Sequence, residues 1–248
     1  MARHLPHGWL DLVRQLALFA AACCGYELVR GLVGVSGARP RHDATRIIDL
    51  ERALHVFVEP SIQGWGEHHA RWLLDIADWT YVNAHFMVTL AALTFIYLRR
   101  NESFYFVRNA FMIAMLIALL GYALYPTAPP RLMAHWGFSD TVEQFTGISL
   151  GNGPSTGLLN PYAAVPSMHV CFAVMVGGAM SQLVRGRASR LLWRLYPPYI
   201  AFVVVVTGNH YLTDVVLGLV TAALARTLAT QLLARARPDT WAFAGTTA

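Results

Sequence analysis

The sequence predicts an all-α integral membrane protein, a bundle of about six transmembrane helices with one amphipathic helix at the membrane interface. Of its 248 residues, 56% are hydrophobic and only 13% are charged. Uncharged apolar runs such as 109–130 recur along the chain, and a helix needs roughly 20 such residues to cross a bilayer. A soluble domain with a large core is the alternative, and these runs argue against it.

The elements are expected in one membrane domain that covers 1–248, with spans at 12–35, 75–98, 105–126, 166–184, 195–212 and 213–234. The first span has an apolar centre like that of a signal peptide, but Glu27 and Arg30 interrupt it and further spans follow. A retained signal anchor is therefore expected.

The segment 45–60, between the first two spans, has the pattern of the amphipathic helix. Its apolar residues recur at helical spacing and are offset from Arg46, Asp49 and Arg52; they are Ile47, Leu50, Leu54, Phe57 and Val58. This arrangement is typical of a helix that lies on a membrane surface. The helix is expected to serve as a packing element or lid, or to admit lipid.

The charge pattern predicts the orientation in the membrane. All nineteen basic residues are Arg, which suggests a GC-rich bacterial genome. Arginines cluster at 99–108, 185–194 and 235–237, so the positive-inside rule places these segments and both termini in the cytoplasm. The connections at 127–165 and 208–213 then face the periplasmic or extracellular side of a bacterial plasma membrane. The arginines at 39–71 oppose this orientation, but charges in long connections have less influence on the orientation of a membrane protein.

The same pattern limits the partners. The net charge of +5 comes from short clusters between apolar runs, which excludes nucleic acid as a partner. Cys23, Cys24 and Cys171 show no metal-ligand or disulfide spacing and are expected to be small buried hydrophobes. The expected partners are the bilayer and its lipids, with no metal, cofactor or required protein partner.

The first chemical segment is His-Tyr-Leu-Thr-Asp at 210–214. If this segment is helical, His210 and Asp214 lie on one face, where the carboxylate fixes the tautomer and leaves the other ring nitrogen as a nucleophile. Ionisable groups within spans are costly to bury and are therefore candidates for function. A buried pair that braces two helices is the structural alternative.

The second segment is Pro-Ser-Met-His at 166–169, before a long apolar run. Pro166 suits a first helical turn, so the start of this helix, with the Ser167 hydroxyl, is a candidate anion site. His169 is placed to protonate a departing oxygen. An ordinary helix cap beside an interfacial histidine is the alternative.

The third segment, Pro-Pro-Arg at 129–131, ends the third span. The Arg131 guanidinium can bind two phosphate oxygens at once, although a lone interfacial arginine also suits lipid headgroups. One topology brings all three segments to the same face. Asp75, Asp78, Tyr81 and His85 form a polar stripe on the second span that is expected to face the interior, with Tyr81 and His85 as possible acceptor or headgroup contacts. Asn152 and Asn160 are weaker candidates.

In this order, the three segments resemble the motifs of the type 2 phosphatidic acid phosphatase superfamily, which includes lipid phosphatases and vanadium haloperoxidases. The likeness covers a catalytic core of roughly 45–234. It implies that His210 attacks phosphorus and Asp214 orients it, while His169 protonates the leaving group. Arg131 and Ser167 are then the phosphate-binding residues.

Several positions depart from the common pattern of that superfamily. Leu124 replaces a usual Lys, Val203 and Val204 replace a usual Ser-Arg pair, and Met168 replaces a usual Gly. With these departures, the sequence resembles one branch of the superfamily, the inositol phosphorylceramide synthase (aureobasidin-resistance) branch. That branch contains phosphotransferases.

The expected function is therefore a membrane phosphotransferase that acts on lipid phosphate esters through a phosphohistidine, moving a phosphoryl or phosphoryl-alcohol headgroup to a lipid or polyol hydroxyl. A lipid or polyprenyl phosphate phosphatase, with water as acceptor, is one alternative. A small transporter with His210 and Asp214 as proton relay is another, but it leaves Arg131 and the 166–169 segment unexplained.

Overall fold

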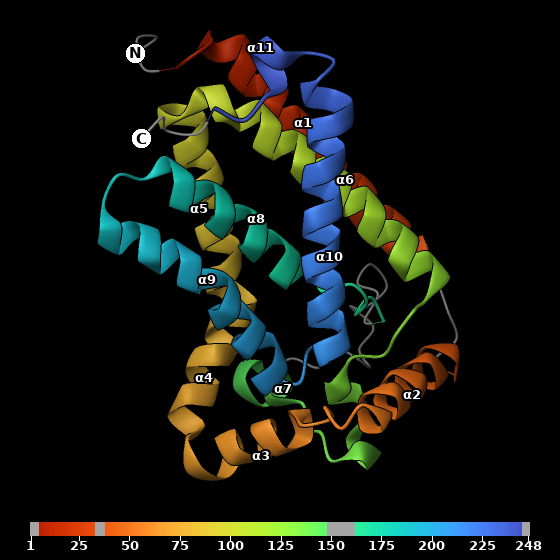
Figure 1. Ribbon diagram of the computed structural model, residues 1–248. Helices are drawn as coiled ribbons and strands as arrows, with labels where there is room; N and C mark the ends of the chain where they lie inside the picture. The colour runs from red at the N-terminus through yellow and green to blue at the C-terminus, as the bar shows by residue number, and fades with distance from the viewer. Residues whose placement is uncertain (1–4, 33–37, 148–161, 245–248) are drawn as a thin grey trace.

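The computed structural model describes residues 5–32, 38–147 and 162–244, and every regular element in those ranges is helical (Figure 1). The α-helices are α1 (Gly8–Leu32), α2 (Ala38–Ala53), α3 (Glu59–His69), α4 (Arg71–Trp79), α5 (His85–Arg99), α6 (Asn101–Leu124), α7 (Thr141–Thr146), α8 (Met168–Leu183), α9 (Arg187–Val206), α10 (Leu212–Leu228) and α11 (Pro238–Trp241). A π-helical turn, η2 (Thr80–Ala84), joins α4 to α5, and another, η6 (Ala229–Ala234), extends α10.

Three of the expected spans have the length and apolarity needed to cross a bilayer: Arg71–Arg99, Asn101–Leu124 and Leu212–Ala234. The other three expected spans are helical, but they do not meet both conditions among the described residues. α1 carries Asp11, Arg14 and Glu27, and α8 is a shorter apolar helix. α9 begins at Arg187 instead of 195 and contains Pro197 and Pro198.

The expected amphipathic helix at 45–60 is wrong in detail, because the chain breaks there into two helices. α2 ends at Ala53 and α3 begins at Glu59, and His55 between them has a φ of 59°. Ile47 is buried, but Leu50 and Leu54 on the same predicted face are 50% and 63% exposed. The inward face of α2 is instead formed by residues three and four apart, which are Asp43, Ala44, Ile47, Ile48 and Glu51.

The long helices form a bundle in which α6, α8 and α10 pack together around small residues such as Ala114, Ala118, Ala222 and Ala225. Much of the apolar surface stays outside the core, with Phe86, Leu116 and Leu124 between 63% and 72% exposed. Apolar exposure on this scale is typical of helices that face lipid. The long helices and their exposed faces are those of a membrane protein.

The two ends of the bundle are formed by different helices. The start of α1 and the short helix α11 lie at the end opposite α2 and α3 (Figure 1). The α5–α6 turn lies beside this terminal end, where Arg100 donates to the Leu183 carbonyl and Ser103 donates to the Ala244 carbonyl. The arginine clusters at 99–100 and 185–190 therefore gather away from α2, α3 and α7, which surround the start of α10.

Candidate active site

His210 lies in a tight turn between α9 and α10. The turn begins at Gly208, whose φ of 65° favours glycine. The backbone N–H groups of Asn209 and His210 then both donate to the Val204 carbonyl at 3.0 Å. The chain thus leaves α9 abruptly and presents His210 two residues before α10 begins.

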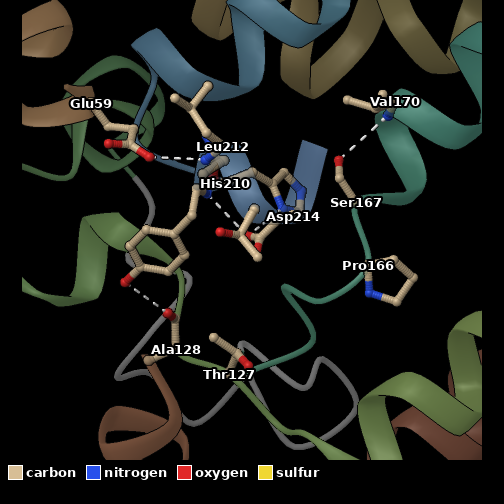
Figure 2. A network of polar contacts seen from close by, with 12 residues as sticks. Glu59, Thr127, Ala128, Pro166, Ser167, Val170, His210, Leu212 and Asp214 are labelled. Carbon is tan, nitrogen blue, oxygen red and sulfur yellow. Dashed lines mark hydrogen bonds and ion pairs between the residues drawn. The ribbon is translucent and has the colours of Figure 1, made fainter. Parts of the chain in front are cut away.

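Asp214 reaches back to His210 from the first turn of α10 (Figure 2). His210 Nδ1 lies 3.2 Å from Asp214 Oδ2, and the Tyr211 backbone N–H donates to the same oxygen at 3.0 Å. The predicted pairing is present, but the predicted reason was wrong, because His210 is outside the helix. The spacing works since Asp214 sits at the third helical position, where an acidic side chain can bond the backbone before the helix.

This geometry fixes which ring nitrogen of His210 faces the carboxylate. Asp214 is fully buried and His210 is 5% exposed, so water competes little for their contact. With Nδ1 directed at Asp214, Nε2 is the nitrogen directed away from it. The arrangement can hold His210 in the tautomer that a nucleophile needs.

The Pro-Ser-Met-His segment starts α8, as predicted, although Pro166 precedes the helix cap and is not in the first turn. Ser167 is the cap, and its hydroxyl accepts a hydrogen bond from the Val170 N–H at 3.4 Å. Its own N–H donates to the Asp214 carbonyl at 3.1 Å. Ser167 therefore fastens the start of α8 to the first turn of α10, and its side chain is buried.

Arg131 lies in a short 3-10 turn after α6, and it is 9% exposed. Its backbone N–H donates to the Gly208 carbonyl at 2.7 Å, and its Nη1 pairs with Asp140 Oδ2 at 2.8 Å. Nε is buried and has no hydrogen-bond partner among the described residues. Asp140 thus fixes one nitrogen of the guanidinium, and the buried Nε can donate a hydrogen bond to a bound anion.

The three segments meet at one cavity of about 120 Å³. Its lining among the described residues consists of Tyr26, Tyr81, Tyr122, Pro129, Arg131, Ala163, Ala164, Met168, His169, Asn209 and His210. The His169 and His210 rings lie 6.0 Å apart, centroid to centroid. Arg131 is the one lining residue in this set with a permanent charge.

A larger hollow of about 260 Å³ lies elsewhere, between α6, α8 and α10. Its described lining is almost wholly apolar and includes no histidine or carboxylate. The smaller cavity is therefore the candidate active site. Within the described ranges, no group of three His, Cys, Asp or Glu side chains could hold a metal ion.

The predicted polar stripe divides between the interior and the surface. Asp78 and His85 are buried, and Tyr81 is partly exposed. Asp75 is wrong as an interior residue, because its side chain is 44% exposed and pairs with Arg71. Asp78 instead accepts from the Thr141 hydroxyl at 2.9 Å, which holds α7 against α4.

Tyr81 and His85 both contact His169. The Tyr81 ring lines the cavity and stacks on His169 at 4.3 Å between centroids. His85 lies 5.0 Å from His169, does not line the cavity, and places Nδ1 2.9 Å from the Tyr196 hydroxyl. The π-helical turn η2 carries Tyr81, and such turns are frequent at functional sites.

Four residues at the site had no assigned role from sequence: Asp140, Asn209, Glu51 and Glu59. Asp140 caps α7 by accepting from the Glu143 N–H at 2.9 Å, so the Asp-x-x-Glu spacing could have located a helix start but not its contact with Arg131. Asn209 donates to the Thr207 hydroxyl at 2.8 Å and lines the cavity. Asn152 and Asn160 lie outside the described residues.

Three of the four positions that depart from the superfamily pattern lie away from the cavity lining, and the fourth, Met168, is part of that lining. Leu124 is 72% exposed at the end of α6, whereas Val203 and Val204 are buried in apolar clusters. Apolar side chains thus occupy positions where the common pattern has cations or a serine. Among the described residues, Arg131 alone carries permanent positive charge into this cavity.

A comparison with protein-family models matches residues 45–228 to the PAP2 superfamily. No curated protein and no solved structure matches the chain significantly. The matched region includes Arg131, Ser167, His169, His210 and Asp214, and it covers most of the sequence. Membership supports phosphatase or phosphotransferase chemistry on phosphate esters. The chain belongs to the PAP2 superfamily.

Proposed function

We propose that this protein is a membrane phosphotransferase that acts on lipid phosphate esters through a phosphohistidine on His210. It moves a phosphoryl or phosphoryl-alcohol headgroup, of the inositol phosphate kind, to a lipid or polyol hydroxyl. The observation that carries the proposal is that His169, His210 and Arg131 line one cavity, with Asp214 buried behind His210.

In the first step, His210 Nε2 attacks the phosphorus of the donor ester. The bond between phosphorus and the ester oxygen breaks, and His169 gives its proton to that oxygen. Asp214 stabilises the positive charge that develops on the His210 ring, much as the buried aspartate does in a serine protease triad. Arg131 binds the phosphate oxygens while negative charge is spread over them.

In the second step, His169 acts as base. It takes the proton of the acceptor hydroxyl, whose oxygen attacks phosphorus, and the bond between phosphorus and nitrogen breaks. His210 is then neutral again and His169 is protonated, ready for another donor. Water in place of the acceptor makes the same site a phosphatase.

Two features support a lipid substrate. The cavity lies at the starts of α8 and α10 and near the end of α6, and two of these helices are long and apolar enough to cross a bilayer. Lipid headgroups lie at this depth beside the ends of spanning helices. Three tyrosines in the lining, Tyr26, Tyr81 and Tyr122, offer ring surfaces to an alcohol or polyol.

The experiment compares three variants of the purified protein in detergent. His210→Ala should lose turnover of every substrate, because no phosphohistidine forms. His169→Ala should retain part of the first step with para-nitrophenyl phosphate, whose phenolate leaves without a proton, and lose alkyl esters. Asp214→Asn should fold and lose about 10⁴-fold in kcat, as in the analogous triad. His135→Ala, an exposed histidine near Arg131, is the control.

The products distinguish transfer from hydrolysis. Lipid mass spectrometry after incubation with phospholipids, with and without inositol or another polyol, should show a new phospholipid species. Free phosphate alone would make the protein a phosphatase. Labelled phosphate trapped on His169, or robust turnover by folded His210→Ala protein, would show that the roles of the histidines are wrong.

A further inference from the structure

The start of α10 is held by three acidic side chains from three helices. The backbone N–H groups of Tyr211, Leu212 and Thr213 donate to Asp214 at 3.0 Å, Glu59 at 2.9 Å and Glu51 at 2.7 Å, respectively. Figure 2 shows the contact between Glu59 and Leu212 beside His210. The first N–H groups of a helix have no partner inside it, and its dipole favours negative charge there.

Glu51 and Glu59 come from α2 and α3, far from α10 in the sequence. Both are buried, with exposed fractions of 1% and 0%. Each uses Oε1 for α10, and Glu51 Oε1 also accepts from the Thr213 hydroxyl at 2.7 Å. Neither Oε2 has a donor among the described residues.

The two carboxyl groups interact, and the contact with Glu59 is one of the causes that raise the pKa of Glu51. A carboxylate cannot donate, so a hydrogen bond between the two groups needs a proton on one of them, and that proton would serve oxygens that otherwise have no donor among the described residues. Burial, and then the hydrogen bond to Glu59, raises the pKa of Glu51 to about 8. Glu51 therefore stays largely protonated at neutral pH.

We infer that Glu51 and Glu59 are positioning residues for His210: their buried carboxyl groups hold the first turn of α10 and thereby the His210–Asp214 contact. This inference rests on the proposed nucleophilic role of His210. The pair reaches His210 through the main chain, because Leu212 and Thr213 lie between His210 and Asp214. Neither glutamate lines the cavity.

The proton on Glu51 limits the charge in this buried region. The titratable groups that interact with the pair are Asp214 on α10 and, just before that helix, the Tyr211 hydroxyl. If the proton leaves, three carboxylates surround one helical turn, and their repulsion is strong where water is excluded. A carboxyl whose pKa is raised by folding contributes stability below its ordinary pKa, and that stability is lost as pH rises through about 8.

Glutamine imitates the protonated state at either position. In Glu51→Gln, the amide oxygen can accept from Thr213 and the amide N–H can donate to Glu59, with no proton to lose. Glu51→Ala removes the hydrogen bonds with Thr213 and the contact with Glu59, so the Thr213 N–H loses this acceptor. Asp49→Asn, on the exposed side of α2, is the matched control.

The first measurement is thermal unfolding from pH 6 to 10 in detergent, together with the ¹⁵N spectrum of the His210 ring. Between pH 6 and about pH 8 the wild type and Asp49→Asn should lose stability, whereas Glu51→Gln should not show this loss, because glutamine has no proton to lose. Glu51→Ala should shift the His210 tautomer signals and Glu51→Gln should restore them. An equal loss of stability between pH 6 and about pH 8 in wild type and Glu51→Gln would overturn the inference.

The second measurement is turnover of para-nitrophenyl phosphate at pH 7. Glu51→Ala should lower kcat about tenfold or more with little change in KM, because a displaced nucleophile is costly, and Glu51→Gln should restore kcat. An unchanged kcat in folded Glu51→Ala protein would contradict a positioning role. If the wild type turns over no phosphate ester, the proposed function fails, and the unfolding and ¹⁵N measurements still decide the inference.

Discussion

Gly218 on α10 lies against the start of α8. A Cβ atom at this position would lie 2.5 Å from the Ser167 carbonyl oxygen and 3.3 Å from Val170 Cβ. Ordinary contacts begin at 3.4 Å, so Gly218→Ala requires α8 and α10 to separate by up to 0.9 Å. The obstacle is main-chain oxygen, which cannot rotate away as a side chain can.

The expected effect is on catalysis more than on folding. Overpacking costs about 1–3 kcal/mol, and the gain of about 1 kcal/mol in helix propensity from Gly to Ala offsets part of it. The separation of α8 and α10 affects the hydrogen bond from the Ser167 N–H to the Asp214 carbonyl. Ser167 lies two residues before His169. A misplacement of about 1 Å can lower kcat about 10²-fold, so we expect a loss on that scale with alkyl phosphate esters.

The assay compares kcat for an alkyl ester and for para-nitrophenyl phosphate. Gly218→Ala should lose less with the aryl ester, since the separation acts at the helix that carries the leaving-group acid. Gly178→Ala on α8, where a Cβ meets nothing within 4 Å, should retain activity and match or exceed wild-type stability. Folded Gly218→Ala protein as active as Gly178→Ala on both esters would refute this reasoning.

Three further predictions follow from the same geometry. Asp140→Asn removes the ionic partner of Arg131 and should raise KM about tenfold or more, whereas Glu143→Gln on the exposed side of α7 should not; equal KM values would exclude the ion pair from substrate binding. Activity should persist in excess EDTA and fall with vanadate, which mimics five-coordinate phosphorus. Loss of activity on chelation that a divalent metal restores would contradict a mechanism without a metal. In a cysteine-free background, Glu143→Cys should be labelled from outside intact cells and Ser189→Cys only after permeabilisation; the opposite labelling would invert the topology.

Local patterns in the sequence predicted most of the helices, because long apolar runs and helix-start signals act within a few residues. They failed at α9, where Arg187, Arg190 and Arg194 give the first turns a polar sequence and Pro197 and Pro198 interrupt it. The helix continues there because α8 packs closely against it, with a Cβ on Gly177 lying 2.6 Å from the Trp193 carbonyl oxygen. That carbonyl is the one whose usual partner Pro197 lacks.

The candidate site shows the same contrast between residues that local motifs identify and residues that only tertiary contacts identify. His210, Asp214, His169 and Arg131 could be proposed from short motifs whose side chains have distinctive chemistry. Glu51 and Glu59 could not, because their partners are main-chain groups more than 150 residues away, and nothing in the local sequence distinguishes them from surface glutamates. The break between α2 and α3 was missed for the same reason, since contacts with α10 decide which face of α2 turns inward.

Main-chain hydrogen bonds connect the three motifs, and they determine how this part of the protein unfolds. Thr127 donates to Tyr162 at 2.8 Å, Arg131 to Gly208 at 2.7 Å and Ser167 to the carbonyl of Asp214 at 3.1 Å, so each motif is tied to another through the backbone. A local opening that breaks one of these bonds loosens the others, which makes the three segments one cooperative unit. Their amide protons should therefore exchange with deuterium at one common rate. A destabilised molecule is then either fully assembled or inactive, and cellular proteases encounter the segments of an opened site together.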